Sequence, residues 1–573
     1  MPGRSCSDTQ CASKPVSNTN RSAYQSAVQQ FRAKNYDVAL AELRAAIERG
    51  ALADNEVVNG QRLLADLYVA KGQPRRAASI LETLLHQLTP SHTRYVPVMV
   101  HRAGILLRTG DIAGASQLDM NALLKTADVN LLAQSGYILT LCEQFASALQ
   151  VYTTALKYQP DSPELLFNCA SACRAMGDLE QAESLYDRAI LLAPKDWEAY
   201  KNRSDLRRQT NARNHIDELR GLQRENGTDR IAQVQLNFAL AKELEDLKRY
   251  EESFSHLQAG ARARRAGLRY DPKNDLAVMA AIAETFDGAF FRESAVAPDL
   301  DSDGSTGEDL KEKAEGEQGQ GIIFILGMPR TGTTLVDRLL TSVPGVVSAG
   351  EPDTFARLLA AQVSGRKNLS PEGKTAFVRA SREVDFKKLG RAYSEQLKSR
   401  AAQQGAKVIL DKNPMNFLYA GLIHRALPAA RIVHLQRDPV DTCYAIYKTL
   451  FKTAYPFSYD QQELGCYYVA YRQLMQHWRE ASPGAIYDLQ YEKLVTALES
   501  ESRSLLKFCG LEWHPQVLDF YRQKRSGTAT ASAAQVRQPL YTSSIGKWRH
   551  HASQLTPLVQ LLEQAGTPVS ADS

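Results

Sequence analysis

The sequence predicts two architectures in one chain: an all-α helical-repeat solenoid, followed by an α/β domain with a mainly parallel sheet. Three observations lead to this fold class. A pattern of small and aromatic residues recurs after 34 residues in the first half, a strongly acidic stretch lies past the middle, and short β-rich runs alternate with helical stretches after it. At 573 residues the chain is also too long for one ordinary domain.

The repeat is clearest between residues 145 and 194. Four positions of one segment recur 34 residues later, because Ala148, Tyr152, Ala155 and Pro160 match Ala182, Tyr186, Ala189 and Pro194. This period is typical of tetratricopeptide repeats, in which small residues let paired helices approach closely and proline ends the second helix. Weaker copies extend the pattern, so we expect a solenoid over residues 22–293. Its concave surface would bind a protein partner, or the repeats would mediate self-association.

Two polar segments are expected to flank the solenoid. Residues 1–21 lack the apolar core of a signal peptide and predict a disordered leader. Residues 299–320 carry eight acidic side chains against two lysines and have almost no apolar side chain to bury. We therefore predict an acidic linker at 294–319, followed by the second domain at 320–567.

Composition limits the classes of partner and compartment. The net charge of +5 is too small to favour nucleic acid, although it allows a local anion site. No apolar run approaches the roughly 20 residues that cross a bilayer. The eight cysteines include no C-x-x-C pair, which favours reduced thiols. We expect a cytoplasmic protein with no transmembrane segment, no nucleic-acid partner and no metal site.

The second domain is defined by five β-rich runs that alternate with helical stretches. They lie at residues 322–326, 346–349, 407–410, 431–435 and 485–489. Ligands of parallel sheets bind beyond the carboxyl ends of the strands. The residues that follow each run are therefore the candidates for function.

The first run leads into "GMPRTGTT", which has the glycine spacing of a P-loop. Gly327 and Gly332 allow a tight turn, and the start of the next helix favours a phosphate-like group. Arg330 supplies a planar cation suited to bidentate contact with an oxyanion. Thr333 stands where a P-loop has its lysine, which weakens the case for transfer of a γ-phosphate.

Charged residues follow the next three runs as well. Glu351 is a candidate general base for an acceptor hydroxyl or, alternatively, a helix N-terminal acid, and Asp353 is a second candidate for either role. Lys412 could meet a developing negative charge. Arg437 precedes a helix that starts near Pro439, so it predicts a second anion site. Two anion sites on one sheet edge fit a nucleotide with phosphates at both ends.

This combination resembles the sulfotransferases that depend on 3′-phosphoadenosine 5′-phosphosulfate (PAPS). It is most similar to the bacterial-type group with tetratricopeptide repeats before the catalytic domain, and more distantly similar to tyrosylprotein sulfotransferases. The resemblance spans roughly residues 318–567. It rests on "GMPRTGTTL", "AGE", "DKNP", "QRDPVDTC", "YEKLV" and "SAAQVRQPLYTSSIGKW".

The resemblance implies a role for each matching residue. The 5′-phosphosulfate would contact Arg330, Thr331, Gly332, Thr333 and Thr334. Glu351 would be the base, Lys412 would assist transfer, and Arg437 would bind the 3′-phosphate. A C-terminal loop that closes over the nucleotide would bring Arg537, Gln538 and Lys547 near the phosphates. The family usually has a serine eight residues after the arginine, whereas this chain has Ala445.

The resulting hypothesis is in-line transfer of a sulfuryl group from PAPS to an acceptor hydroxyl, such as one on a protein tyrosine or a glycan, without a metal. Two other functions stay open from the sequence. One is a nucleotide-dependent kinase or NTPase, which the glycine spacing of the first loop also allows. The other is a catalytically degenerate tetratricopeptide scaffold, to which Ala445 points.

Overall fold

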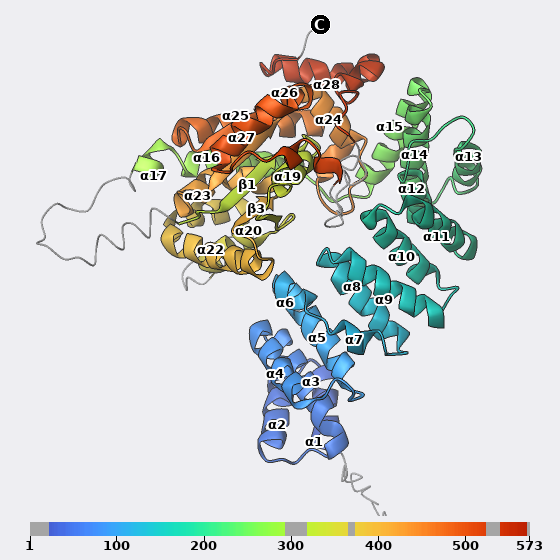
Figure 1. Ribbon diagram of the computed structural model, residues 1–573, viewed down its shortest axis with the longest axis vertical. Helices are drawn as coiled ribbons and strands as arrows, with labels where there is room; N and C mark the ends of the chain where they lie inside the picture. Colours follow the sequence, from blue (N-terminus) through green and yellow to red (C-terminus); the bar gives the residue numbers. More distant parts are fainter. Residues whose placement is uncertain (1–21, 293–317, 365–372, 523–538, 570–573) are drawn as a thin grey trace, which may run out of the picture. The chain divides into compact units, whose positions relative to one another are not determined.

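The computed structural model describes residues 22–292, 318–364, 373–522 and 539–569 (Figure 1). The chain divides into two compact units, Met1–Cys142 and Glu143–Ser573. The predicted leader and nearly all of the predicted linker lie outside the described residues, so the domain boundaries stay predictions. Among the helices that the structure describes, none is both long and apolar enough to cross a membrane.

The first unit is helical throughout its described part. Its fully buried alanines include Ala39 and Ala46 on one helix, and Ala77 on the helix two further along the chain. Such small residues allow paired helices to pack closely. The helices are α1 (Ala23–Arg32), α2 (Tyr36–Glu48), α3 (Asp54–Ala70), α4 (Pro74–Gln87), α5 (Tyr95–Arg108), α6 (Ile112–Ser116), α7 (Met120–Leu123) and α8 (Val129–Leu141).

The second unit opens with the helices that carry the clearest repeat, α9 (Phe145–Tyr158), α10 (Pro163–Met176) and α11 (Leu179–Leu192). The repeated alanines and tyrosines are all buried, from Ala148 and Tyr152 on α9 to Ala182 and Tyr186 on α11, whereas the repeated prolines that follow these helices are exposed. Local signals set the helix ends, since the side chain of Ser162 caps α10 and Gly177 ends it in a left-handed conformation. The predicted helical repeat is therefore confirmed.

Further helices follow before the sheet. They are α12 (Trp197–Ser204), α13 (Ile216–Glu225), α14 (Arg230–Asp246), α15 (Tyr250–Ala266), α16 (Pro272–Thr285) and α17 (Gly288–Arg292).

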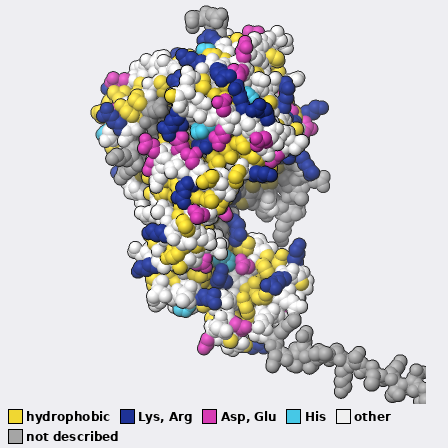
Figure 2. Space-filling model, turned by 90° about the vertical axis from the view of Figure 1, so that its right-hand side faces the viewer, with side chains coloured by type: hydrophobic (Ala, Val, Ile, Leu, Met, Phe, Trp, Pro, Cys, Tyr) yellow, Lys and Arg dark blue, Asp and Glu magenta, His cyan; other side chains and the backbone are white. Residues whose placement is uncertain are grey.

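Figure 2 views one face of the molecule, on which basic and acidic side chains are interspersed. This mixture agrees with the small net charge.

The sheet has five strands in the order β2-β3-β1-β4-β5, and each neighbouring pair is parallel. The strands are β1 (Ile322–Gly327), β2 (Val346–Ser348), β3 (Val408–Lys412), β4 (Arg431–Gln436) and β5 (Ile486–Gln490). Each agrees with a predicted run to within two residues at either end. One detail differs, because Lys412 is the last residue of β3 and not part of the following turn.

Helices cover both faces of the sheet. Along β1, Ile322, Phe324 and Leu326 join the larger core, whereas Ile323 and Ile325 face the smaller core on the other side. This alternation is the period of a strand buried on both faces. The remaining helices are α19 (Thr333–Thr341), α20 (Thr354–Ser364), α21 (Lys374–Ala380), α22 (Phe386–Gln403), α23 (Ala420–Ala426), α24 (Pro439–Tyr447), α25 (Gln461–Ala481), α26 (Tyr491–Thr496), α27 (Leu498–Cys509) and α28 (Ala552–Gln564).

The larger core also includes α14, α15 and α16. The ring of Phe238 on α14 lies 6.3 Å from that of Tyr459, edge to face. The ring of Phe254 on α15 lies 6.1 Å from that of Tyr447. Arg265 on α15 forms an ion pair of 2.7 Å with Glu463 on α25. The helices α14, α15 and α16 therefore share one hydrophobic core with the sheet and the helices around it.

Candidate active site

The loop after β1 has a backbone that only specific residues can adopt. Gly327 has a φ of 145° and Gly332 a φ of 110°. A Cβ atom at Gly332 would lie 2.7 Å from the ring of Tyr491, and one at Gly327 would lie 2.7 Å from the Leu435 carbonyl oxygen. Arg330 also has a left-handed φ of 65°, a conformation that costs a non-glycine residue about 1–2 kcal/mol. The loop thus packs tightly between β4 and α26 before α19 begins.

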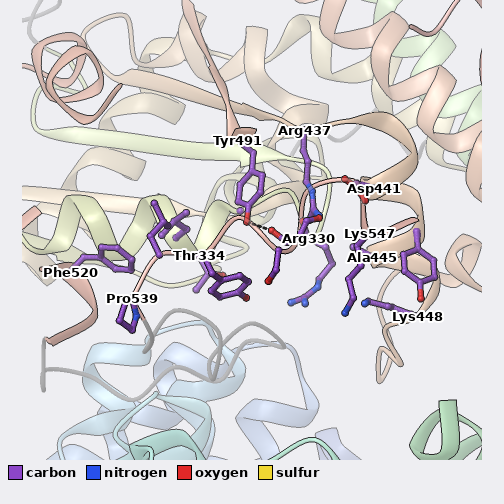
Figure 3. Close-up of a pocket in the computed structure, with 17 residues that line it drawn as sticks. Arg330, Thr334, Arg437, Asp441, Ala445, Lys448, Tyr491, Phe520, Pro539 and Lys547 are labelled. Atoms are coloured by element: carbon purple, nitrogen blue, oxygen red, sulfur yellow. Dashed lines mark hydrogen bonds between the residues drawn. The ribbon is translucent and has the colours of Figure 1, made fainter. Parts of the chain in front are cut away.

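A cavity of about 150 Å³ opens beside this loop (Figure 3). Its lining combines cations from the loop after β1, from both ends of α24 and from the C-terminal segment with apolar and hydroxyl side chains. The lining residues include Arg330, Gly332, Thr334, Arg437, Asp441, Tyr444, Ala445, Lys448, Tyr491, Tyr541, Ser544 and Lys547. A concentration of positive charge at the carboxyl end of a parallel sheet favours an anionic ligand.

Arg437 is fixed at the end of β4 by contacts to two loops. Its guanidinium donates to the Arg330 carbonyl at 3.1 Å and to the Ser544 carbonyl at 2.7 Å. It also lies 4.9 Å from the centre of the Tyr491 ring, and the Tyr491 hydroxyl is 2.7 Å from Ser544 Oγ. These contacts hold the guanidinium at the wall of the cavity and tie the C-terminal segment to the first loop.

Asp441 on α24 fastens the same C-terminal segment. Its carboxylate accepts the amide N–H of Gly546 at 2.6 Å and that of Trp548 at 3.1 Å. The first of these amides immediately precedes Lys547 and the second follows it. Asp441 therefore fixes the backbone from which the Lys547 side chain enters the cavity.

Lys547 meets Lys448 at a shared carboxylate. Lys448 follows α24 directly, and both ammonium groups pair with Glu245 of α14, at 3.0 Å for Lys448 and 3.1 Å for Lys547. The hydroxyl of Tyr444 donates to the same carboxylate at 2.7 Å. Burial alone would raise the pKa of Glu245, but the two lysines and the hydroxyl lower it well below its usual value.

The two lysines differ in their electrostatic surroundings. Burial lowers the pKa of Lys448 to about 8, against the opposing effect of Glu245. Burial also acts to lower the pKa of Lys547, but Glu245 outweighs it and the pKa is raised. Nearby His551 has its pKa lowered by burial to about 4, so its ring is neutral at neutral pH.

A second polar group lies where β2 and β3 end. The ammonium of Lys412, almost fully buried, contacts the carboxylate of Glu351, whose side chain is 43% exposed. The amide of Lys412 donates to the Gly350 carbonyl at 3.0 Å, which fixes the two strand ends to each other. The buried cation can stabilise an anion, and the solvent-accessible carboxylate beside it can accept a proton.

Further carboxylates surround this pair. Asp337 on α19 accepts a hydrogen bond of 2.6 Å from Ser348 Oγ, and burial raises its pKa while Lys412 opposes the rise. Asp411 precedes Lys412 in β3 and accepts hydrogen bonds from Tyr393 and Asn416. Burial raises the pKa of Asp411 to about 7.

The structure brings together most of the residues predicted from the sequence. Arg330, Gly332, Thr334, Arg437 and Lys547 line one cavity, whereas Glu351 and Lys412 contact each other at the neighbouring strand ends. Two predicted residues lie apart from that cavity. Thr333 is buried, and Thr331 donates to the Met328 carbonyl at 2.8 Å and lines an adjacent hollow.

Three other predicted positions have different outcomes. Arg537 and Gln538 lie outside the described residues. Asp353 is 79% exposed and lies 3.8 Å from Arg357 of α20, the helix that it directly precedes, so it is a surface carboxylate. Within the part of the chain that the structure describes, no group of three or more metal-ligating side chains is arranged to hold an ion.

Sequence reasoning missed several residues of the cavity. Tyr491 directly follows β5, so the strand-end rule that found Arg437 could also have found it. Lys448 lies three residues after Ala445, one helical turn further along the chain, and that spacing was a usable signal. Glu245 lies 203 residues before Lys448, and nothing in the local sequence indicates that the two meet.

Comparisons with known proteins agree with the two architectures of the chain. Residues 322–515 match the model of a family described as the sulfotransferase family, and residues 143–203 match that of the tetratricopeptide repeat. An uncharacterized protein of Aquifex aeolicus is 26% identical over 92% of this chain and 68% of its own length. A protein-tyrosine sulfotransferase of Drosophila melanogaster is 24% identical over 40% of this chain and 46% of its own length.

The solved structures that resemble the chain include a sulfotransferase domain from the Synechococcus PCC 7002 olefin synthase. It is 18% identical, covers 44% of this chain and 97% of that domain, and has a TM-score of 0.32.

Proposed function

We propose that this protein, which carries a sulfotransferase-family domain together with tetratricopeptide repeats, transfers a sulfuryl group from PAPS to an acceptor hydroxyl. The observation that carries the proposal is the cavity lined by Arg330, Arg437, Lys448 and Lys547 beside the first loop. Its cations and its glycine-dependent loop suit a ligand with several anionic groups.

The cavity would hold both phosphate-bearing groups of the nucleotide. Arg330, Thr334 and the amides that begin α19 would hold the 5′-phosphosulfate, since a helix N-terminus favours such a group. Arg437 and Lys547 would hold the 3′-phosphate. Thr331, Thr333, Arg537 and Gln538 remain proposed nucleotide contacts from the family resemblance.

Glu351 and Lys412 would carry the chemistry. Glu351 would take the proton of the acceptor hydroxyl as the oxygen–sulfur bond forms. Lys412 and Arg330 would stabilise the 5′-phosphate oxygen as its bond to sulfur breaks. The contact between Glu351 and Lys412 would keep the base and the transfer-assisting cation side by side at the strand ends.

The proposed acceptor is a hydroxyl on a protein tyrosine or on a glycan. A relative named as a protein-tyrosine sulfotransferase supports the first class. The repeats would bind a protein partner or mediate self-association.

Substitution of the proposed reacting groups tests this function. We expect Glu351→Gln and Lys412→Met to lower the rate of label transfer from PAPS by about 10²- to 10⁴-fold, as removal of a general base or an electrostatic stabiliser typically does. Asp353→Asn is the matched control, because this exposed carboxylate lies two residues from Glu351. The assay is incorporation of radiolabelled sulfate into cell extract, followed by identification of the labelled species.

Three outcomes would contradict the proposal or a part of it. Full activity in Glu351→Gln would remove Glu351 from the base role. Thermal stabilisation by ATP–Mg²⁺ but not by adenosine 3′,5′-bisphosphate would favour a kinase or NTPase instead. Tight bisphosphate binding with no labelled product would favour a scaffold function.

A further inference from the structure

One end of the cavity is completed by a residue from outside the sheet domain. Glu245 lies near the C-terminal end of α14, and its carboxylate pairs with both Lys448 and Lys547. Its side chain is only 9% exposed. Glu245 does not line the cavity, whereas both lysines do. The carboxylate therefore lies behind the lysines and not in the space that a ligand would take.

We propose that Lys448 is a further nucleotide-binding residue, which contacts the 3′-phosphate, and that Glu245 is the positioning residue that holds Lys448 and Lys547 for that contact. The inference rests on the proposed use of PAPS. It assigns to α14 a part in building the nucleotide site.

The position of Lys448 supports its role. Ala445 has no hydroxyl to donate at the place where the family usually has a serine. Lys448 comes one helical turn later, lines the same cavity as Ala445 and Arg437, and carries a full positive charge when protonated. An ammonium group is a stronger partner for a phosphate than a hydroxyl is.

The surroundings of Glu245 support a positioning role. Two lysines that approach each other repel, and a buried carboxylate between them removes that repulsion. Three separate donors, on Tyr444, Lys448 and Lys547, fix the orientation of the carboxylate. The ammonium groups are thereby held at one end of the cavity, within reach of a shared anion.

The charge balance leaves the cavity positive. Four cations line it, and the carboxylate of Asp441 in its wall is engaged by the amides of Gly546 and Trp548. Glu245, which does not line the cavity, neutralises one of the two lysine charges. A phosphate dianion would still meet a net positive surface.

The affinity for two nucleotides that differ only in the 3′-phosphate tests the proposal. Adenosine 3′,5′-bisphosphate and adenosine 5′-monophosphate are titrated by calorimetry into the full-length wild type and its variants. We expect Lys448→Ala to weaken bisphosphate binding about 10- to 100-fold, as loss of a charge-assisted hydrogen bond would. Binding of the monophosphate should stay within about twofold. Lys452→Ala, at an 80% exposed lysine of the same region, is the matched control.

The Glu245 variants test the positioning role through pH. Among the residues that the structure describes, the titratable groups next to Lys448 include Glu245, Tyr444, Lys547 and His551. Removal of the carboxylate lets burial lower the pKa of Lys448 further. We therefore expect bisphosphate binding by Glu245→Gln to fall off at a pH at least one unit lower than in the wild type. Glu245→Asp should restore the wild-type profile in part, and Glu252→Gln, at an exposed carboxylate of α15, should not change it.

The outcomes separate the two proposals. If Lys448→Ala weakens the binding of both nucleotides equally, or of neither, the proposed role of Lys448 is overturned. Tighter bisphosphate binding by Glu245→Gln at every pH overturns the positioning role and shows that Glu245 competes with the phosphate. A wild type that binds the bisphosphate no better than the monophosphate contradicts the proposed function itself.

Discussion

Gly332 has two separate reasons to be glycine. Its φ of 110° disfavours any side chain, and an added Cβ would lie 2.7 Å from the Tyr491 ring. Gly345 also has a positive φ, of 80°, but an added Cβ would have no neighbour within 4 Å. Substitution of these two glycines therefore distinguishes the effect of backbone strain alone from that of strain combined with a steric conflict at the cavity.

We predict that Gly332→Ala displaces Tyr491 and with it the contacts of Arg437. Such a conflict costs about 1–3 kcal/mol, so stabilisation by adenosine 3′,5′-bisphosphate in a thermal melt should be largely lost. Gly345→Ala should lower the melting temperature through backbone strain alone. The rise in melting temperature on addition of the nucleotide should be as large as in the wild type. Equal nucleotide shifts in the two variants would contradict a specific role for Gly332.

Asp411 gives a residue-scale prediction about pH. Burial raises its pKa to about 7 in the folded protein, above the value of about 3.9 in an unfolded chain. Between these values the folded state holds more protons, so this residue makes the free energy of unfolding fall as pH rises. Between pH 5 and pH 7 the free energy of unfolding of Asp411→Asn should fall by about 2 kcal/mol less than that of the wild type. Urea denaturation at both pH values measures this, with the exposed Asp519→Asn as control.

At the scale of the elements, the strands could be predicted closely from the sequence. Each is a short apolar run buried between two layers of helices, so β1 and β4 stand out from the amphipathic helices around them. The strand-end rule then placed Arg330, Glu351 and Arg437, since parallel strands bring their carboxyl ends to one edge.

The part that could not be predicted lies between elements distant in sequence. Glu245 of α14 contacts Tyr444 and Lys448, which lie at the end of α24, and Lys547 of the C-terminal segment. No local pattern encodes that packing. It results from the hydrophobic core that α14, α15 and α16 share with the sheet domain.

At the scale of the whole molecule, this shared core predicts how the chain tolerates truncation. A fragment of residues 143–573 keeps the second compact unit whole and should unfold in one cooperative transition. A fragment of residues 320–573 would expose the faces of Tyr447 and Tyr459 that Phe254 and Phe238 cover. Each uncovered aromatic side chain costs about 1.5–3 kcal/mol, so this fragment should lack a cooperative transition.

Circular dichroism during heating compares the two fragments. The prediction is wrong if residues 320–573 melt cooperatively within a few degrees of the longer fragment. A stable shorter fragment would also be informative for the nucleotide site, because it lacks Glu245 and should bind the bisphosphate as Glu245→Gln does.

The carboxylate of Glu245 also limits how this domain can be recombined. A chimera that joins the sheet domain to a foreign array of repeats would inherit the lysines of the cavity but not their partner on α14. To keep the nucleotide site intact, the junction of the chimera has to lie before Arg230. That position is well upstream of the acidic segment, which by its composition would be chosen as the junction.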